Sequence, residues 1–250
     1  MTDAAIETRA LSKRYGSTTA VRSLDLEVPQ GVVYGFLGPN GAGKTTTMRM
    51  LTGLIEPTEG QGTVADTDIE DRRALVDRIG LLPEEPPLYN ELTGREQLQF
   101  AADLRNRSWD EVADRAVGIC EALDLAADLD RRIDGYSKGM RRKTAFTQAV
   151  MHDPAVVFLD EPTSGLDPRA AKTLRELIVD LASEDTTVFL STHILPVVEE
   201  IADRVGVLYD GRLVAEGSPE GLVGQTAEDG AADADLEDAF LELTEERATA

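Results

Sequence analysis

The sequence contains one cysteine, Cys120, in 250 residues, which excludes any disulfide within the chain. Long apolar runs are also missing: the stretch AVVFL at 155–159 has the length of a buried strand, whereas a membrane-spanning helix needs about 20 residues. The first ten residues, MTDAAIETRA, do not show the basic and then apolar order of a secretory signal. We therefore expect a cytoplasmic protein in which Cys120 is a small buried side chain.

Basic residues are scarce. The chain has 25 Lys and Arg, of which five are Lys, against 47 Asp and Glu, so its formal net charge is −22. Such a field repels polyanions and argues against nucleic acid as a partner. An acidic surface suits a high-salt cytoplasm, where screening removes the self-repulsion, and we interpret the chain as halophilic, from a haloarchaeon. An acidic protein from an ordinary cell is the alternative.

Hydrophobic periodicity predicts an α/β protein. Short apolar runs over 6–36 indicate a β-rich start that ends in a buried strand. A helical pattern then runs from Thr45 to a stop at Gly53, and the segment from about 93 to 127 has helical spacing with no strand candidate. Three later segments are expected to be two central parallel strands and a hairpin, at 155–160, 186–192 and 205–217.

The segment GPNGAGKT at 38–45 matches the phosphate-binding pattern G-x-x-x-x-G-K-[ST], after a predicted strand and at the start of a predicted helix. Its glycines let the backbone turn so that N–H groups face phosphate oxygens, and the helix presents its positive end to the same anion. Lys44 is expected to reach the β- and γ-phosphates, and the Thr45 hydroxyl to ligate Mg²⁺. The predicted nucleotide-binding residues here are Gly38, Pro39, Asn40, Gly41, Ala42, Gly43, Lys44, Thr45 and Thr46.

Acidic residues follow the apolar run in VVFLDEP at 156–162. Asp160, at the end of a buried strand, is predicted to hold the metal, and Glu161 is predicted to be the base that activates water. His193 follows the strand expected to lie beside that of Asp160, which would place its ring near the γ-phosphate. His152 has no comparable neighbours, and we interpret it as incidental to function.

Four segments, GPNGAGKTT, YSKGMRRK, FLDEPTSGLD and STHILPVVEEIADRVGVLYDGRLVAEG, appear in the order and approximate spacing of the ATP-binding subunit of an ABC transporter. The chain resembles that family over nearly its whole length. The resemblance implies an α/β P-loop NTPase core with an N-terminal antiparallel β subdomain and a helical insert. It also implies ATP and Mg²⁺ as cofactors and ATP hydrolysis as the reaction.

Further expectations come from the same resemblance. The ATPase domain would cover 1–224, with the helical subdomain at about 93–150, and 225–250 would be an acidic segment with a short docking helix. Tyr15 matches the aromatic residue that stacks on adenine, and Asp167 matches the loop that communicates between two sites. In this family two subunits close head-to-tail, so Ser137 and Gly139 of YSKGM would contact the γ-phosphate held by the second copy of a homodimer.

Two motifs depart from the common family pattern. The signature is YSKGM instead of LSGGQ, and Glu84 stands where a metal-contacting Gln is usual, so Glu84 is a candidate metal ligand beside Thr45 and Asp160. Both departures resemble the branch that energises type-2 permeases, which export drugs, polysaccharides, haem-maturation factors or sodium. The ending LEDAFLELT resembles that branch too, and its apolar residues Leu236, Phe240 and Leu243 have the i, i+4, i+7 spacing that a docking helix needs.

The expected function is therefore a transport motor that sits on the inner face of the membrane through an integral membrane permease. Other ABC ATPases are the alternative. Those of DNA repair or chromosome structure would carry coiled-coil insertions or zinc-binding cysteines, and those of translation would carry two cassettes. A GTPase switch is disfavoured because the chain has no Asn-Lys-x-Asp guanine signature.

Overall fold

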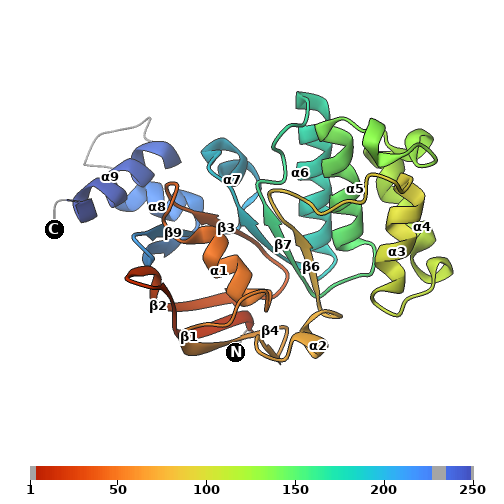
Figure 1. Cartoon of the computed structure of the whole chain (residues 1–250). Helices are drawn as coiled ribbons and strands as arrows, with labels where there is room; N and C mark the ends of the chain where they lie inside the picture. Colours follow the sequence, from red (N-terminus) through yellow and green to blue (C-terminus); the bar gives the residue numbers. More distant parts are fainter. Residues whose placement is uncertain (1–3, 227–234, 249–250) are drawn as a thin grey trace.

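A computed structural model describes residues 4–226 and 235–248, and Figure 1 shows their arrangement as two sheets with helices on either side. Residues 227–234, within the predicted acidic segment, lie outside the described part. One sheet is antiparallel with the strand order β2-β1-β4-β5, and the other has six strands in the order β10-β9-β3-β8-β7-β6. Among the described residues, no helix has both the length and the apolar character to cross a bilayer.

The strands are β1 Ala4–Tyr15, β2 Thr18–Pro29, β3 Val33–Leu37, β4 Glu59–Val64, β5 Thr67–Asp68, β6 Ile79–Leu82, β7 Val156–Asp160, β8 Thr187–Ser191, β9 Arg204–Tyr209 and β10 Arg212–Gly217. The α-helices are α1 Lys44–Leu51, α2 Arg72–Leu75, α3 Gly94–Asp103, α4 Trp109–Ala122, α5 Lys138–Val150, α6 Pro168–Ser183, α7 Leu195–Ile201, α8 Pro219–Thr226 and α9 Leu236–Ala248. Two short 3₁₀ turns, Ala126–Asp128 and Ile133–Gly135, precede α5.

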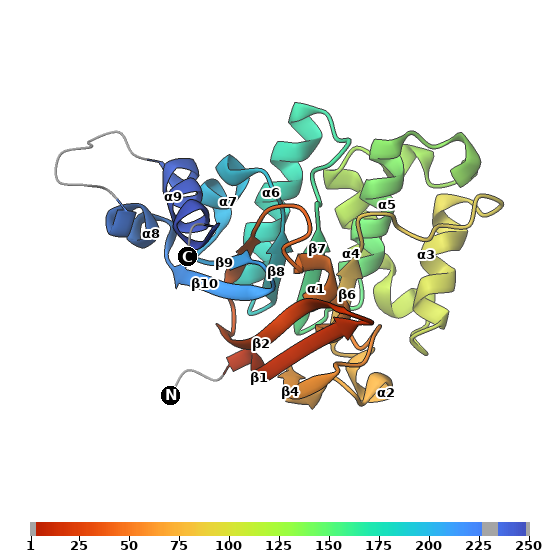
Figure 2. The same ribbon diagram turned by 60° about the vertical axis from the view of Figure 1, so that its left-hand side comes forward.

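The predicted central strands are confirmed. β7 and β8 are buried at every position and pair in parallel, and β3 pairs in parallel with both β8 and β9. On one face of this sheet α1 lies between it and the antiparallel sheet, where the Phe189 ring contacts those of Phe36 and Phe158 at centroid distances of 5.0 and 5.5 Å. Figure 2 shows α1 enclosed between the two sheets. The other face is covered by α5, α6 and α7.

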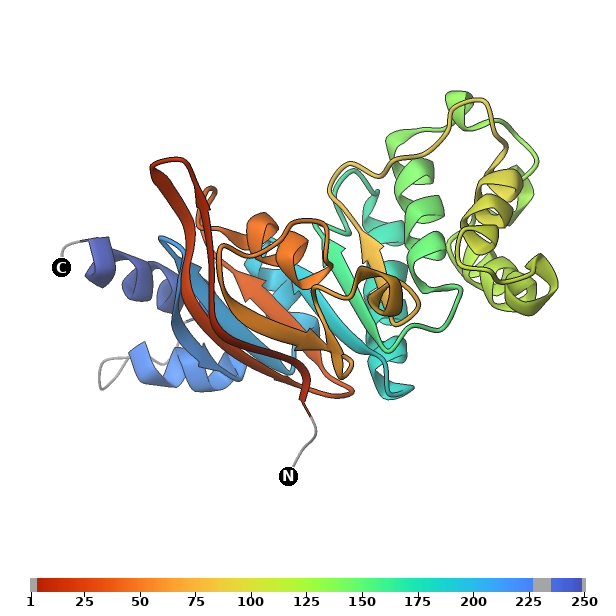
Figure 3. The same cartoon turned by 60° about the horizontal axis from the view of Figure 1, so that its bottom comes forward.

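The helical insert has its own hydrophobic core. Helices α3, α4 and α5 pack around a separate buried cluster that includes Cys120, which is fully buried as predicted. Capping boxes start the first two helices: Thr93 pairs with Glu96 at α3, and Ser108 pairs with Glu111 at α4. Figure 3 shows the insert standing to one side of both sheets. This arrangement lets the insert behave as a distinct packing unit.

The C-terminal part returns to the core. The predicted hairpin is present as β9 and β10, and its turn residues Asp210 and Gly211 both have positive φ, as a tight two-residue turn needs. The apolar residues of α9 contact the large core cluster under the six-stranded sheet: Leu236 is buried in it, and Phe240 and Leu243 pack against it. This apolar stripe of α9 therefore packs against its own chain.

Candidate functional site

The loop between β3 and α1 is shaped by glycine. Gly43 is the residue before α1 and has φ 110°, and a Cβ there would lie 2.4 Å from the carbonyl oxygen of Ala20. A Cβ on Gly38 would lie 2.3 Å from the carbonyl oxygen of Leu208, and Gly41 has φ 83°. Only glycine fits such contacts and dihedral angles without strain. The loop backbone therefore lies close to β2 and β9, and the N-terminus of α1 points into the loop.

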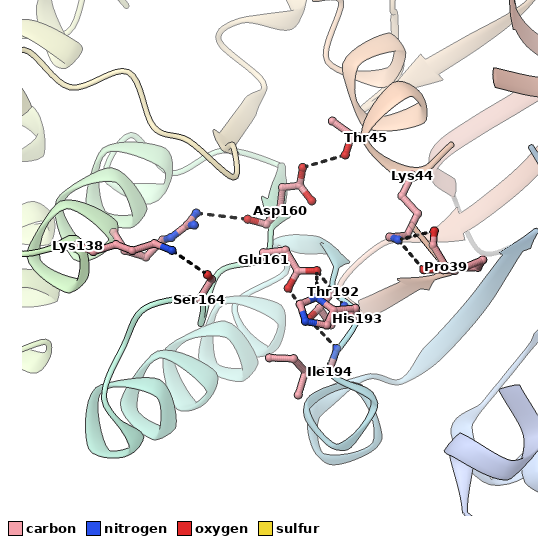
Figure 4. A network of polar contacts seen from close by, with 12 residues as sticks. Pro39, Lys44, Thr45, Lys138, Asp160, Glu161, Ser164, Thr192, His193 and Ile194 are labelled. Atoms are coloured by element: carbon pink, nitrogen blue, oxygen red, sulfur yellow. Dashed lines mark hydrogen bonds and ion pairs between the residues drawn. The ribbon is translucent and has the colours of Figure 1, made fainter. Parts of the chain in front are cut away.

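Lys44, the first residue of α1, is half-buried and folds over the loop. Its ammonium donates hydrogen bonds to the carbonyl oxygens of Gly38 at 2.5 Å and Pro39 at 3.2 Å (Figure 4). Burial lowers the pKa of the ammonium from its usual value, and nearby carboxylates oppose that shift. This cation therefore lies where it faces both the loop and the acidic residues at the end of β7.

Asp160 ends β7 and is 6% exposed. The Thr45 hydroxyl donates to its carboxylate at 3.4 Å, so the two predicted metal ligands from separate elements meet here. Burial raises the pKa of Asp160, and the carboxylates of Glu161 and Glu84 add to that rise. The site is thus rich in negative charge and would gain from a cation.

Glu161 is held in an unusual conformation. Its φ is +49°, a left-handed geometry that costs a non-glycine residue about 1–2 kcal/mol. Its amide donates to the Ser191 carbonyl at 2.8 Å, and its carboxylate accepts bonds from the Thr192 hydroxyl at 2.9 Å and from the His193 backbone amide at 2.9 Å. The His193 Nδ1 lies 2.7 Å from the same carboxylate (Figure 4). The end of β8 therefore fixes the carboxylate on the strained residue.

These groups line one pocket of about 370 Å³. Its lining brings together nine residues predicted from the sequence, namely Gly38, Pro39, Asn40, Lys44, Thr45, Glu84, Asp160, Glu161 and His193. Four other residues of the lining were not predicted to belong to the site: Ser164, Thr192, Leu195 and Phe240. Thr192 stands next to His193 in the motif and could have been found there, whereas Phe240 comes from α9, far along the chain. Leu37 also contributes to the wall.

The donor set fits Mg²⁺. It consists of hard oxygen ligands: the Thr45 hydroxyl, the Asp160 carboxylate and the exposed carboxylate of Glu84 on the same pocket wall. In the described part of the chain, no group of three or more His, Cys, Asp or Glu side chains could hold a metal unaided. A bound Mg²⁺ would therefore need phosphate oxygens and water as further ligands, as is usual where the metal binds with a nucleotide.

Several predicted residues lie outside this lining: Gly41, Ala42, Gly43 and Thr46 belong to the loop and α1 behind it, and Tyr15, Ser137 and Gly139 lie elsewhere. Tyr15 is at the β1–β2 turn, 48% exposed, with the Lys13 ammonium 5.4 Å from its ring centroid. Ser137 is exposed and caps α5, accepting a hydrogen bond from the amide of Met140 at 3.1 Å. Gly139 follows it in the first turn of that helix.

Two other predicted residues have local roles. Asp167 caps α6, accepting bonds from the amides of Arg169 and Ala170, and the Ala170 amide is the main cause of its lowered pKa. His152 is buried, with Nε2 3.0 Å from the Ile79 carbonyl oxygen, and burial lowers its pKa to about 4. It is neutral at physiological pH and does not line the pocket.

Comparison with known proteins agrees with this geometry. The family model for the ABC transporter matches residues 21–164. The chain is 39% identical to the bacitracin transport ATP-binding protein BcrA of Enterococcus faecalis, over 84% of this chain and 68% of that protein. It is 41% identical to a fluoroquinolones export ATP-binding protein of Mycobacterium tuberculosis, over 87% and 72% of the two chains.

A solved structure of the ATP-binding subunit of an ABC transporter superposes with a TM-score of 0.88 at 30% identity, covering 96% of this chain and 99% of that one. The P-loop NTPase fold predicted from the sequence is thereby confirmed. The strand order, the phosphate loop and the acidic strand end all belong to that fold. The chain is accordingly a member of the ABC transporter family, an ATP-binding and ATP-hydrolysing subunit coupled to transport.

Proposed function

We propose that two copies of this chain close head-to-tail on ATP and drive a separate membrane permease that exports compounds of the antibiotic and drug class. ABC ATPases pair with permeases and form dimers. Relatives of this chain are named for bacitracin transport and for fluoroquinolone export, which supports export of such compounds here. In this proposal the chain lies at the inner face of the membrane through its permease.

The position of the signature loop is the observation that carries the dimer. The pocket contains a phosphate loop, a metal-binding acid and a fixed carboxylate, yet Ser137 and Gly139 lie outside its lining. Ser137 is exposed at the N-terminus of α5, where amides face outward at the positive end of the helix. A loop of this kind, unused by its own pocket, suits a phosphate held by a second copy.

Within each pocket we assign roles from the contacts. Lys44 and the loop amides bind the phosphates, and Thr45, Asp160 and Glu84 hold Mg²⁺, which neutralises phosphate charge when bound. Glu161 is the base that orients and deprotonates the attacking water, and His193 keeps its carboxylate in place while reaching the γ-phosphate. Tyr15, at the exposed β1–β2 turn, stacks on adenine. The cradle amides and Lys44 then stabilise charge on the leaving phosphates.

The charge of −22 supports a high-salt origin for this motor. At molar salt the Debye length is about 3 Å, against about 30 Å at 0.01 M, so the acidic surface repels itself far less. Two subunits that both carry this charge could then approach each other closely.

Mixing two inactive variants tests the head-to-tail arrangement. The first variant, Lys44→Ala, lacks the ammonium that binds phosphate. The second variant, Ser137→Arg, has its own signature loop blocked. In a mixed dimer one pocket carries both lesions, and the other pairs an intact phosphate loop with an intact signature loop. We expect ATP hydrolysis to return to roughly half the wild-type rate per mixed dimer. A mixed dimer that forms and stays inactive would refute the arrangement.

A further inference from the structure

Arg142 is a buried cation that the known motifs leave without a role. It lies on α5, five residues after Ser137, and is 3% exposed. Among the Lys, Arg, Asp and Glu side chains that the structure describes, Arg142 and Asp160 alone are buried. A buried charge is costly unless it is paired and hydrogen-bonded, so its contacts indicate what it is for.

The guanidinium of Arg142 bridges two other segments. One terminal nitrogen donates to the carbonyl oxygen of Pro83 at 2.9 Å and, more weakly, to that of Asp160 at 3.4 Å. The other donates to the carbonyl oxygen of Glu84 at 2.7 Å. The planar fork of arginine suits two acceptors at once, which lysine cannot match. One side chain thus joins α5, the end of β7 and the loop between β6 and α3.

Charge supports the same placement. Burial lowers the pKa of Arg142, and the carboxylates of Asp160, Glu84 and Glu161 oppose that shift in this order. The guanidinium keeps its charge at all physiological pH values. Together with Lys44 it supplies positive charge to three carboxylates that otherwise repel one another. Arg142 holds this loop through the backbone oxygens of Pro83 and Glu84, so the Glu84 carboxylate is left to face the pocket.

We propose that Arg142 is a positioning residue that fixes the Glu84 loop against the end of β7 and makes both move with α5. The proposal rests on the assignment of Glu84 and Asp160 to the nucleotide site made above. Ser137 and Arg142 lie on the same helix, about 7.5 Å apart along its axis. A phosphate that engages Ser137 from the second copy would therefore shift Glu84 and Asp160 of this copy through a rigid helix.

Arg142→Gln tests the bridge, because glutamine lacks the fork and the charge. Hydrogen exchange is measured on the amides of the loop at 83–92, with β7 and α5 as internal references. We expect exchange in the loop to rise at least tenfold while the references stay unchanged. The turnover number should fall about 10–100-fold, as is typical when residues behind metal ligands are lost. Nucleotide affinity in EDTA should stay within about threefold, because it depends on the phosphate loop.

Two further variants keep the outcome decisive. Arg141→Gln removes the same charge from the neighbouring side chain, whose guanidinium bonds Asn90 at the far end of the loop and the Ile133 carbonyl. It should raise exchange only around Asn90, and it should leave the amides of Glu84 and Glu85 and the turnover number near wild type. Arg142→Lys keeps the charge and loses the fork, so it should resemble Arg142→Gln. Full rescue by lysine would overturn the bridging role and leave a role for charge alone.

Unchanged loop exchange in both Arg142 variants would also overturn the proposal. If Arg142→Gln does not fold, as judged by its thermal transition, the lysine variant decides alone. Failure of the underlying site assignment has a different signature: Asp160→Asn would then hydrolyse ATP at the wild-type rate, and Glu84→Gln would leave the Mg²⁺ dependence of nucleotide affinity unchanged, whatever the loop exchange of the Arg142 variants.

Discussion

The sheet end and the helical insert contribute to the same proposed reaction and are built differently. Asp160 ends and Glu161 follows a strand that is buried at all five positions, and the residues just after β8 fix the Glu161 carboxylate. Ser137 is exposed at the start of α5, whose first turn packs with the insert's separate core and whose later turns pack on the sheet. The groups proposed to perform chemistry thus stand at the end of the sheet, whereas the group offered to a partner stands at the exposed start of a helix that Arg142 joins to that sheet end.

The largest expected effect is a loss of ATP hydrolysis when Glu161, at the end of the sheet, is changed. In Glu161→Gln the proposed base is lost while the hydrogen-bond acceptor for Thr192 and His193 remains in part, so hydrolysis should fall about 10²–10⁴-fold. ATP binding should persist, and a closed dimer should accumulate with Mg-ATP. Phosphate release and gel filtration measure the two effects. Wild-type hydrolysis in this variant would exclude Glu161 as the base, and Lys44→Ala, which should neither bind nor dimerise, is the control.

A matched change at Ser137 separates its two roles. Ser137→Asp keeps a side-chain acceptor for the Met140 amide, so α5 should remain capped and the melting temperature should stay within about 2 °C. The added negative charge would repel a phosphate held by the second copy, and hydrolysis should fall at least tenfold. Ser137→Ala should show the reverse order of effects, losing about 1 kcal/mol of stability with a smaller loss of hydrolysis. An active Ser137→Asp protein would contradict contact in trans.

Glu84 sits between the two regions, on the loop that Arg142 holds. In the proposed site its carboxylate is a ligand when Mg²⁺ is present, and it would repel phosphate without the metal. Nucleotide affinity should therefore depend strongly on Mg²⁺, and Glu84→Gln should weaken that dependence while basal hydrolysis continues. ATP titrations with Mg²⁺ and with EDTA, on both forms, measure it. An identical Mg²⁺ effect in the two forms would remove Glu84 from the metal site.

Asp160→Asn tests how much the buried negative charge at the end of β7 destabilises the folded protein. The pKa of Asp160 is raised in the folded protein, chiefly by burial, so the native state binds its proton more tightly than the unfolded state does. Stability from this group is present at low pH and is lost as pH rises through its folded pKa. Without Mg²⁺ the asparagine variant should melt higher at neutral pH, by about 2–4 °C for each kcal/mol gained, and the gain should vanish at low pH. Calorimetry at several pH values measures it.

The smallest expected effect per charge is that of salt on the melting temperature, through the acidic surface as a whole. The excess of 22 negative charges predicts that the melting temperature rises as KCl is raised from about 0.01 M to about 1 M. Thermal melts across that range, with wild type and Asp160→Asn compared, separate surface repulsion from the buried carboxylate. A flat profile would contradict the halophilic interpretation.

The phosphate loop, Asp160, Glu161 and the parallel strands could be predicted because short contiguous motifs encode them, each at the junction of a strand and a turn or helix. The role of Arg142 could not be predicted. Its partners Pro83 and Glu84 are 59 and 58 residues away in sequence, and they accept through backbone oxygens, which every residue has. Phe240 was predicted as part of an apolar stripe, but only the fold brings it to the pocket. The adenine role of Tyr15 and the metal role of Glu84 stay predictions.

Helix α9 offers a spectroscopic consequence. Phe240 lines the nucleotide pocket, and its neighbour Leu241 is 47% exposed on the same helix. An environment-sensitive dye attached through Leu241→Cys would follow a residue of the pocket lining in sequence and would replace no lining side chain. The native thiol, Cys120, is buried and its pKa is raised by that burial, so labelling at neutral pH should favour the new position. The protein thus carries a ready attachment point for following each turnover by fluorescence in real time.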